Sequence, residues 1–381
     1  MRLRTIVKFG TLISVFLFCL AVGIYAFMRL ELTERNRNQN LYSLVPADCI
    51  GVLETDAIND FLNDYSALNY GHELSGIQIP DFCHFLLHGL NNYLTENAHG
   101  LNNQLDQLLV SFHESSTLHD QVVYFKMNEA DEHLLSDMIQ EYTMGEFLPK
   151  KEDYRGKVIW VYPLNNDEFL AVYTESGLFV MSFQKRLIEK VIDAKLDEFS
   201  LDKDQVFSRI CNRKKSRNFF TAYTRTVSIP FLQIEEPCWT EYDFHMNSDV
   251  FYLTGETFVQ DTSSYLTLIK DRIQKIPLVK EKSVFISSDN DSTKLYMDQL
   301  LEADEEHHTL FNESVVNLSH NALFTMVVDM QDIINDPIRY QEFFPSFLLQ
   351  HLQFFQPFIL STQLIQNDNH LSHMWVFTYK N

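Results

Sequence analysis

Glycine is scarce in this chain, with 11 residues among 381. Glycine-rich phosphate loops and tight active-site turns need residues that adopt positive φ, and glycine does so at no steric cost. The scarcity therefore counts against a nucleotide-binding enzyme. It counts equally against collagen-like or linker-rich architectures, which depend on the same residue.

The common catalytic signatures are also missing. The nucleophile elbow G-x-S-x-G does not occur. The zinc-protease motif H-E-x-x-H is absent too, because Ser115 and Ser116 follow His113 and Glu114 without the second histidine. We therefore assign no catalytic residue, no metal and no cofactor from the sequence. A membrane-anchored hydrolase or metal-dependent enzyme with an unrecognised site stays open as an alternative.

Basic residues are outnumbered, with 30 Lys and Arg against 52 Asp and Glu and a net charge of −22. Residues 1–37 alone carry +4, so the remainder carries −26. Nucleic acids and anionic lipid surfaces bind proteins through basic side chains that displace counterions. The composition therefore excludes nucleic acid as a partner of the acidic body.

One long uncharged run is present, from Phe9 to Met28. Twenty apolar residues in a helix match the hydrocarbon core of a bilayer, about 30 Å thick. A cleaved signal peptide has a shorter apolar stretch and a small-x-small site, for which Ala21-Val22-Gly23 is a candidate. The length of the run favours a transmembrane helix, with the lipid bilayer as the partner of residues 9–28.

The charges on either side of this run nearly balance, so the positive-inside bias does not fix the orientation. The general secretory layout predicts a cytoplasmic tail over 1–8, the span over 9–28 and an exported body. Polar, Asn-rich residues 29–45 are interpreted as a stalk. The expected location is thus the inner (cytoplasmic) membrane, with an extracytoplasmic body.

Periodicity in the body predicts two similar blocks at its two ends. The first has strands at 49–54, 108–112 and 121–127, with helices at 57–65 and 81–94. The last has strands at 322–330, 359–366 and 373–379, with helices from 333 and over 340–355. Both carry D-x-I-N-D after the first strand, at Asp56 to Asp60 and at Asp332 to Asp336. The shared order of elements indicates an internal duplication.

The middle of the body contains a second repetition of three strands and a helix. Strands at 158–163, 169–174 and 178–183 precede a helix over 184–194, and strands at 219–224, 239–246 and 250–258 precede a helix over 263–273. These patterns predict an α+β fold of antiparallel sheets with helices on one face. We divide the body into halves 46–195 and 196–381, with residues 196–205 as the boundary.

Three stretches carry a resemblance: Val45 to Glu54, Glu175 to Ile192 and the terminal strands. With the basic and then apolar start, they resemble membrane-anchored bacterial envelope proteins of an uncharacterised domain family. The resemblance covers most of the body through diffuse patterns. It implies an envelope location and an α+β fold, and it implies no activity.

The two D-x-I-N-D segments place Asp56, Asp60, Asp332 and Asp336 in related acidic pairs. Such carboxylates suit Ca²⁺ binding or acid–base chemistry. Aspartate between a strand and a helix more commonly caps the free N–H groups at the helix start. Capping is therefore the favoured interpretation, and an enzyme site between the halves is the alternative.

The most unusual local charge is basic. Residues 205–232 contain no acid and hold Arg209, Arg213, Lys214, Lys215, Arg217 and Arg225. We name Arg213, Lys214, Lys215 and Arg217 as candidate binding residues for an acidic partner or a phosphate-bearing surface. The simpler interpretation is a solvated loop.

Three further patterns have a structural and a functional interpretation. His84 and His88 share a predicted helix face and could ligate zinc, but two ligands do not make a site. The aromatic segment 343–355 is typical of a buried helix, or of a groove for lipid or peptide. Cys49, Cys83, Cys211 and Cys238 allow three disulfide pairings or stay free.

These observations favour a single-pass envelope protein whose body is a non-enzymatic binding or scaffolding module for another envelope protein. An anchored enzyme and a carrier of a hydrophobic ligand are the alternatives.

Overall fold

The computed structural model describes residues 40–55, 107–114, 120–126, 139, 148–164, 169–175, 177–211, 220–225, 229–233, 237–302, 309–344, 348–349, 352–367 and 370–380. The predicted span 9–28 and the predicted helices at 57–65 and 81–94 lie outside these ranges. Within the ranges, no helix combines the length and apolarity needed to cross a bilayer.

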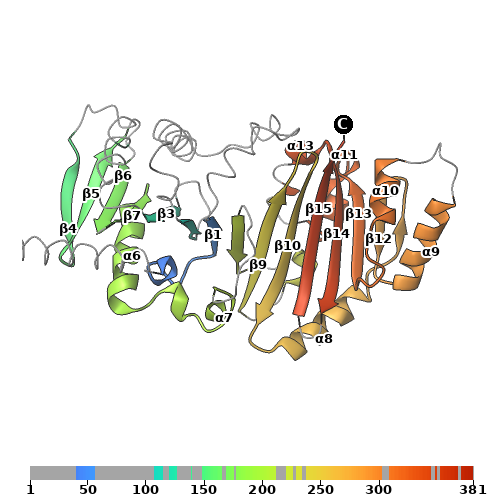
Figure 1. The fold of residues 1–381 in the computed structure, drawn as a ribbon, viewed down its shortest axis with the longest axis horizontal. Helices are drawn as coiled ribbons and strands as arrows, with labels where there is room; N and C mark the ends of the chain where they lie inside the picture. Colours follow the sequence, from blue (N-terminus) through green and yellow to red (C-terminus); the bar gives the residue numbers. More distant parts are fainter. Residues whose placement is uncertain are drawn as a thin grey trace, which may run out of the picture.

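All fifteen described strands belong to one antiparallel sheet, in the order β11-β12-β13-β14-β15-β10-β9-β8-β1-β2-β3-β7-β6-β5-β4. The sheet runs along the long axis of the molecule (Figure 1). Its strands are β1 Gly51–Thr55, β2 Leu108–Phe112, β3 Gln121–Lys126, β4 Lys150–Tyr154, β5 Lys157–Pro163, β6 Phe169–Glu175, β7 Leu178–Ser182, β8 Phe220–Thr224, β9 Cys238–Met246, β10 Val250–Val259, β11 Val279–Lys280, β12 Val284–Ser287, β13 Phe324–Asp329, β14 Phe358–Asn367 and β15 His370–Tyr379.

The helices of the described residues pack against this sheet. They are α6 Lys185–Asp197, α7 Phe207–Cys211, α8 Thr262–Ile273, α9 Asn290–Leu301, α10 Leu310–Val316, α11 Met330–Ile333 and α13 Leu352–Phe355, with short 3₁₀ turns η1 Leu41–Ser43, η4 Leu201–Lys203, η5 Pro230–Leu232 and η7 Pro337–Tyr340. The α+β class is as the sequence predicts.

The prediction that helices cover one face of the sheet is wrong. Trp239 and Cys238 are neighbours on β9 and therefore point to opposite faces. Trp239 belongs to the core beneath α6, whereas Cys238 belongs to the core beneath α8. The strand register places α9 and α10 on the Trp239 face as well. The sequence also predicts several sheets, whereas the described strands form a single sheet.

The two predicted halves meet at the pair formed by β1 and β8, where Val52 lies opposite Tyr223. The proposed boundary, 196–205, packs against the start of the body: Pro46 bridges Ser200, and the N–H of Leu201 donates to the carbonyl oxygen of Val45 at 2.8 Å. Leu41, Leu44 and Val45 are fully buried, so the end of the predicted stalk belongs to the core. Apolar side chains at these positions explain why the segment folds inward.

The β4–β5 hairpin closes the sheet at one end. Its two-residue turn is Arg155-Gly156, and both residues have positive φ, 52° and 76°. A turn of this shape matches the right-handed twist of the flanking strands. Glycine supplies the conformation at the second position without a steric penalty. The turn therefore fixes the register of β4 on β5, with Tyr154 opposite Lys157.

Candidate functional site

Strands β15, β10 and β9 are neighbours near the middle of the sheet. Along β15, Leu371, His373, Trp375 and Phe377 are buried on the Cys238 face, and the residues between them are half-exposed. We define the central face as the half-exposed residues on the Trp239 side of these strands: Glu241, Asp243, His245, Tyr252, Thr254, Glu256, Ser372, Met374 and Val376. Among the described residues, the helices on this side of the sheet pack towards the two ends of the central face.

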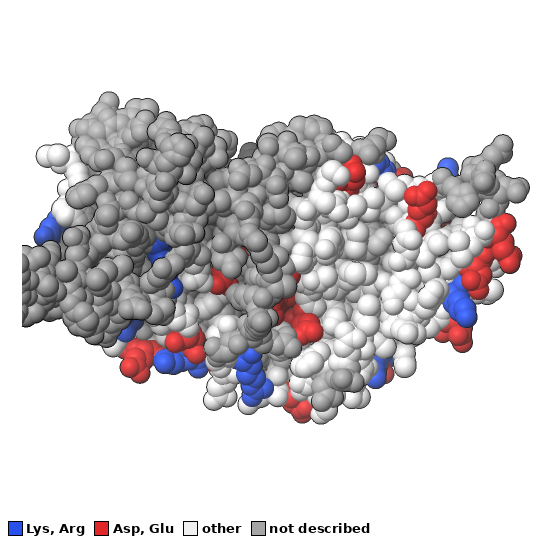
Figure 2. All heavy atoms as spheres, in the orientation of Figure 1, with Lys and Arg blue, Asp and Glu red and all other residues white. Residues whose placement is uncertain are grey.

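The central face is acidic at one border and uncharged over the rest. It holds Glu241, Asp243 and Glu256, and no lysine or arginine. Figure 2 shows a broad expanse without charged side chains over β10, β15 and β14, with acidic side chains gathered beside it. Such a surface suits a polypeptide that combines apolar contacts with polar or basic groups.

Ordered contacts hold several of these side chains in place. Thr221 Oγ1 donates to Asp243 Oδ1 at 2.8 Å. The rings of His245 and Tyr252 stack, with centroids 4.6 Å apart. Rings that are already fixed by stacking lose little conformational entropy when a partner binds, so less of the binding free energy is spent on ordering them.

A buried carboxylate lies next to this face. Glu54 on β1 accepts a hydrogen bond from the Tyr42 hydroxyl at 2.5 Å and another from the Gln107 amide. Burial raises the pKa of Tyr42 well above its usual range, so its hydroxyl stays a donor. The pair ties η1 to β1 and extends the row formed by Thr221 and Asp243.

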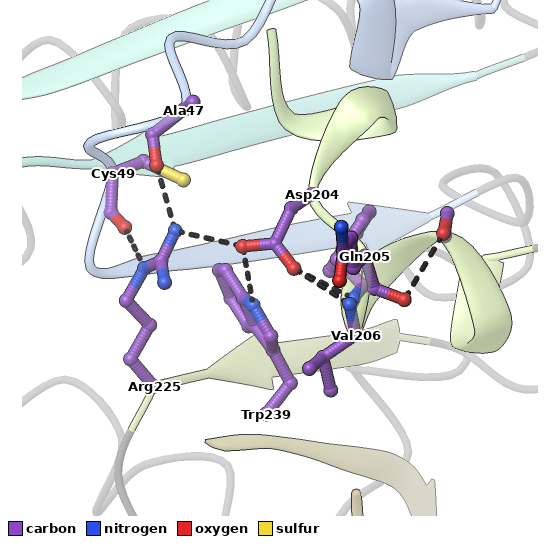
Figure 3. A network of polar contacts seen from close by, with 9 residues as sticks. Ala47, Cys49, Asp204, Gln205, Val206, Arg225 and Trp239 are labelled. Atoms are coloured by element: carbon purple, nitrogen blue, oxygen red, sulfur yellow. Dashed lines mark hydrogen bonds and ion pairs between the residues drawn. The ribbon is translucent and has the colours of Figure 1, made fainter. Parts of the chain in front are cut away.

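A polar network closes the junction between the halves (Figure 3). Arg225 donates from Nε to the carbonyl oxygen of Cys49 at 2.8 Å, and from Nη2 to that of Ala47 at 2.6 Å. Its guanidinium carbon lies 4.5 Å from the ring centroid of Trp239. Asp204 accepts from the Trp239 indole and from Arg225, both at 3.4 Å. One member of the basic stretch, Arg225, is thus held in a structural contact.

The arrangement closest to a hydrolase site combines Ser111 of β2 with His113, which follows that strand, and Asp48, which precedes β1. Ser111 Oγ is 2.9 Å from His113 Nε2, and His113 Nδ1 is 3.9 Å from Asp48 Oδ1. The order serine, histidine, aspartate is that of a nucleophilic triad. Ser111 is 0% exposed, and its hydroxyl also contacts the Tyr124 hydroxyl at 3.1 Å. Burial lowers the pKa of His113 to about 4, so the imidazole is neutral near pH 7.

The predicted acidic pairs are only partly within the described residues. Asp56 and Asp60 lie outside them. Asp329, three residues before Asp332, caps α11 by accepting from the N–H of Gln331 at 3.0 Å. Asp336 precedes η7 without a side-chain cap bond. Asp329, the last residue of β13, is therefore the capping aspartate, and it lies outside the D-x-I-N-D motif.

The candidate partner-binding residues Arg213, Lys214, Lys215 and Arg217 also lie outside the described residues, as do His84 and His88. The ends of this basic segment are described: Cys211 closes α7, and Phe220 pairs with Phe244 on β9. Phe220, which follows the basic segment, therefore lies beside β9, one of the strands of the central face.

Other predicted candidates take structural places. Phe344, Leu348, Phe354 and Phe355 of the aromatic segment are buried in the core beneath the sheet. Cys49, Cys211 and Cys238 are free thiols, and burial raises the pKa of Cys49 to about 12. In the described part of the chain, no three His, Cys, Asp or Glu side chains gather as metal ligands.

Sequence reasoning missed the central face and the contacts around Ser111. Alternation along His370–Tyr379, with Leu371, Trp375 and Phe377 separated by smaller or polar residues, was the available signal for a sheet with one open face. Comparison of the chain with protein-family models, curated proteins and solved structures gives no match. The functional argument therefore rests on the geometry described above.

Proposed function

We propose that this protein is a single-pass envelope protein whose extracytoplasmic body binds another envelope protein through the central face. The observation that carries the proposal is the contrast between the two sides of β15, where Leu371, His373, Trp375 and Phe377 are buried and the residues between them, on the central face, are half-exposed. The membrane anchor at 9–28 and the inner-membrane location rest on the sequence and on the resemblance to anchored envelope proteins.

The chemistry of the central face supports binding over catalysis. Its rings and carboxylates are held by neighbouring strands, which gives a rigid platform of the kind that protein recognition uses. The Ser111–His113 pair, by contrast, is enclosed in the core. A nucleophile must reach its substrate within bonding distance, and a fully buried hydroxyl does not.

The proposal is tested by capture of the intact, anchored chain from detergent-solubilised membranes. The parent chain is expected to recover one protein in stoichiometric amount. Thr254→Arg and Val376→Arg place a bulky cation on the central face and should abolish recovery. Leu295→Arg is the matched control, because Leu295 is 57% exposed on α9, away from that face. Equal recovery by all three variants would exclude the central face.

The basic segment is a separate part of the proposal. We infer that Arg213, Lys214, Lys215 and Arg217 contribute contacts to acidic groups of the same partner, since the strand that follows this segment, β8, pairs with β9. Lys214→Glu combined with Lys215→Glu should slow association, with an effect that shrinks at high salt. An unchanged association rate would remove these residues from the interface.

The hydrolase is kept as a second candidate because of the spacing of Ser111, His113 and Asp48. It predicts that the full chain cleaves an activated ester such as p-nitrophenyl acetate and that Ser111→Ala loses this activity. Equal, background rates for the parent and for Ser111→Ala would contradict it. A hydrophobic-ligand carrier would instead yield co-extracted lipid in stoichiometric amount.

We also propose that the body is an internal duplication. Six strands recur in one spatial order, β1-β2-β3-β7-β6-β5 and β13-β14-β15-β10-β9-β8, which unites both repetitions predicted from the sequence. Against this stands the packing of α6 and α8 on opposite faces, so the copies would have diverged in their helices. An experimental structure in which the two D-x-I-N-D segments do not superpose would end the idea.

A further inference from the structure

Strand β4 is the edge of the sheet at the end far from β11. Among the described strands it pairs with β5 alone, so one edge of its backbone faces outward. In a two-residue hairpin the residues next to the turn form a hydrogen-bonded pair, and such pairs alternate along the ladder. Tyr154, Glu152 and Lys150 therefore bond to β5, whereas Lys151 and Asp153 direct their N–H and C=O groups outward.

The side chains of β4 divide in the same way. On the face shared with α6, Glu152 is bound by Lys150 at 2.9 Å and by Lys185 at 2.7 Å, and the Tyr154 hydroxyl donates to Asp193. Lys151 and Asp153 point to the other face and, within the described part of the chain, form no ion pair. Lys151 Nζ lies 5.9 Å from the ring centroid of Trp160, and Asp153 Oδ1 accepts from the N–H of Gly156.

We propose that β4 pairs antiparallel with β4 of a second copy of this chain, about a two-fold axis through Glu152. In this register Lys151 lies opposite Asp153 of the other copy, and the same contact recurs across the axis. These are the residues whose backbone groups point outward, so each pair exchanges two backbone hydrogen bonds as well as opposite charges. The two sheets would join into one continuous sheet.

The same register accounts for an exposed apolar side chain. Leu148 precedes β4 and is 91% exposed. Antiparallel pairing centred on Glu152 brings Leu148 opposite Gly156 of the other copy. Nothing lies within 4 Å of the Cβ position of Gly156, so the turn leaves room for a neighbouring side chain. Pairing would therefore cover an apolar group that the single chain leaves in water.

Charged edge strands commonly prevent aggregation, and lysines are frequent guards. Strand β4, with the sequence Lys-Lys-Glu-Asp-Tyr, carries charges of both signs and not lysines alone. When it pairs antiparallel with its own copy, each Lys151 faces an Asp153. This charge order would disfavour pairing with a basic edge strand, or with one whose charges do not match, and favour pairing with a second copy of β4. The single like-charge contact, Glu152 against Glu152, is relieved by the two lysines that each carboxylate already binds. This inference does not depend on the function proposed for the central face.

The register can be tested with a cysteine at position 152, which would face the same cysteine of the second copy. The experiment uses the full chain in its membrane under mildly oxidising conditions. Glu152→Cys should form a disulfide-linked homodimer, because cross-strand neighbours at the axis lie within disulfide range. The parent chain gives the background from its five native cysteines. Lys294→Cys, on α9 at the other end of the sheet, is the matched control. Dimer yield at Glu152→Cys no higher than in both controls would overturn the proposal.

A charge swap tests the pairing without any cysteine. Lys151→Asp and Asp153→Lys each create two like-charge contacts, and each should raise the dimer dissociation constant in detergent micelles about 10-fold. Carrying both changes in one chain restores opposite charges and should recover most of the affinity. A double variant as weak as either single one, or adducts of Glu152→Cys with a different protein only, would contradict self-pairing.

Discussion

Arg225 illustrates how single residues hold the two halves of this protein together. It donates to two backbone carbonyl oxygens of the segment before β1, while β8, the strand that Arg225 directly follows, pairs with β1. Arg225→Ala should lower the free energy of unfolding by about 2 kcal/mol, because it leaves two part-buried carbonyl oxygens without their donor. Urea denaturation of the full chain in micelles measures the change.

The matched control for this prediction is Arg186→Ala on α6, where the arginine is exposed. Surface substitutions of this kind stay within about 0.5 kcal/mol. If both variants lose the same stability, the contacts of Arg225 are not what joins the segment before β1 to β8.

Two buried histidines make the stability of the body depend on pH. Burial lowers the pKa of His113 and of His373 from 6.5 to about 4. Between these values the unfolded chain binds protons that the folded chain does not, so stability falls as pH falls from 6.5 towards 4. Each residue accounts for up to about 3 kcal/mol of that loss. Unfolding midpoints measured at several pH values report the slope.

Replacing one of these histidines isolates its share. His113→Gln keeps a polar side chain beside Ser111 and should give a shallower dependence on pH over the same window. His320→Gln serves as the control, because His320 is exposed. An unchanged slope in His113→Gln, or an equal change in His320→Gln, would show that the buried imidazole is not the titrating group.

At the scale of the elements, β10 must pass close to β9. A Cβ at Gly255 would overlap the carbonyl oxygen of Glu241 and lie 2.7 Å from the Tyr242 ring. Gly255→Ala should therefore destabilise the body by about 1–3 kcal/mol through overpacking. Thermal unfolding compared with Thr254→Ala, on the same strand, measures the effect. Equal melting temperatures for the two variants would show that the strands separate at little cost.

Most strands could be predicted from the sequence because their apolar and β-branched runs are short and bounded. The patterns at 108–112, 169–174 and 178–183 correspond closely to β2, β6 and β7, and the helix over 263–273 to α8. The residues within and next to each of these elements determine where it begins and ends. In α8, for example, Asp261 caps the first turn by accepting from the N–H groups of Ser263 and Ser264.

Other elements carry no such signal. Four of the five residues of β4 are charged, and the segment is a strand because the Arg155-Gly156 turn folds it onto β5. α9 and α10 were missed because few of their side chains are buried. The faces of the sheet could not be assigned either, since periodicity shows that a strand has two sides but not which long-range neighbour covers each.

At the scale of the whole molecule, one sheet carries buried cores on both faces and leaves the central face half-exposed between them. The pairing of β1 with β8 joins the two halves into one sheet. Strands β9, β10 and β15 belong to the second half, so a partner bound to them would lie close to this junction. This arrangement supports the proposed function, in which the central face binds a partner while the predicted segment 9–28 anchors the chain.

The most direct test of this account is site-specific photo-crosslinking in living cells. A photo-reactive amino acid at position 254 or 376 of the full chain should give one adduct of discrete mass with another envelope protein, and the same group at position 295 should give none. Adducts absent from positions 254 and 376, or formed equally at position 295, would contradict binding through the central face.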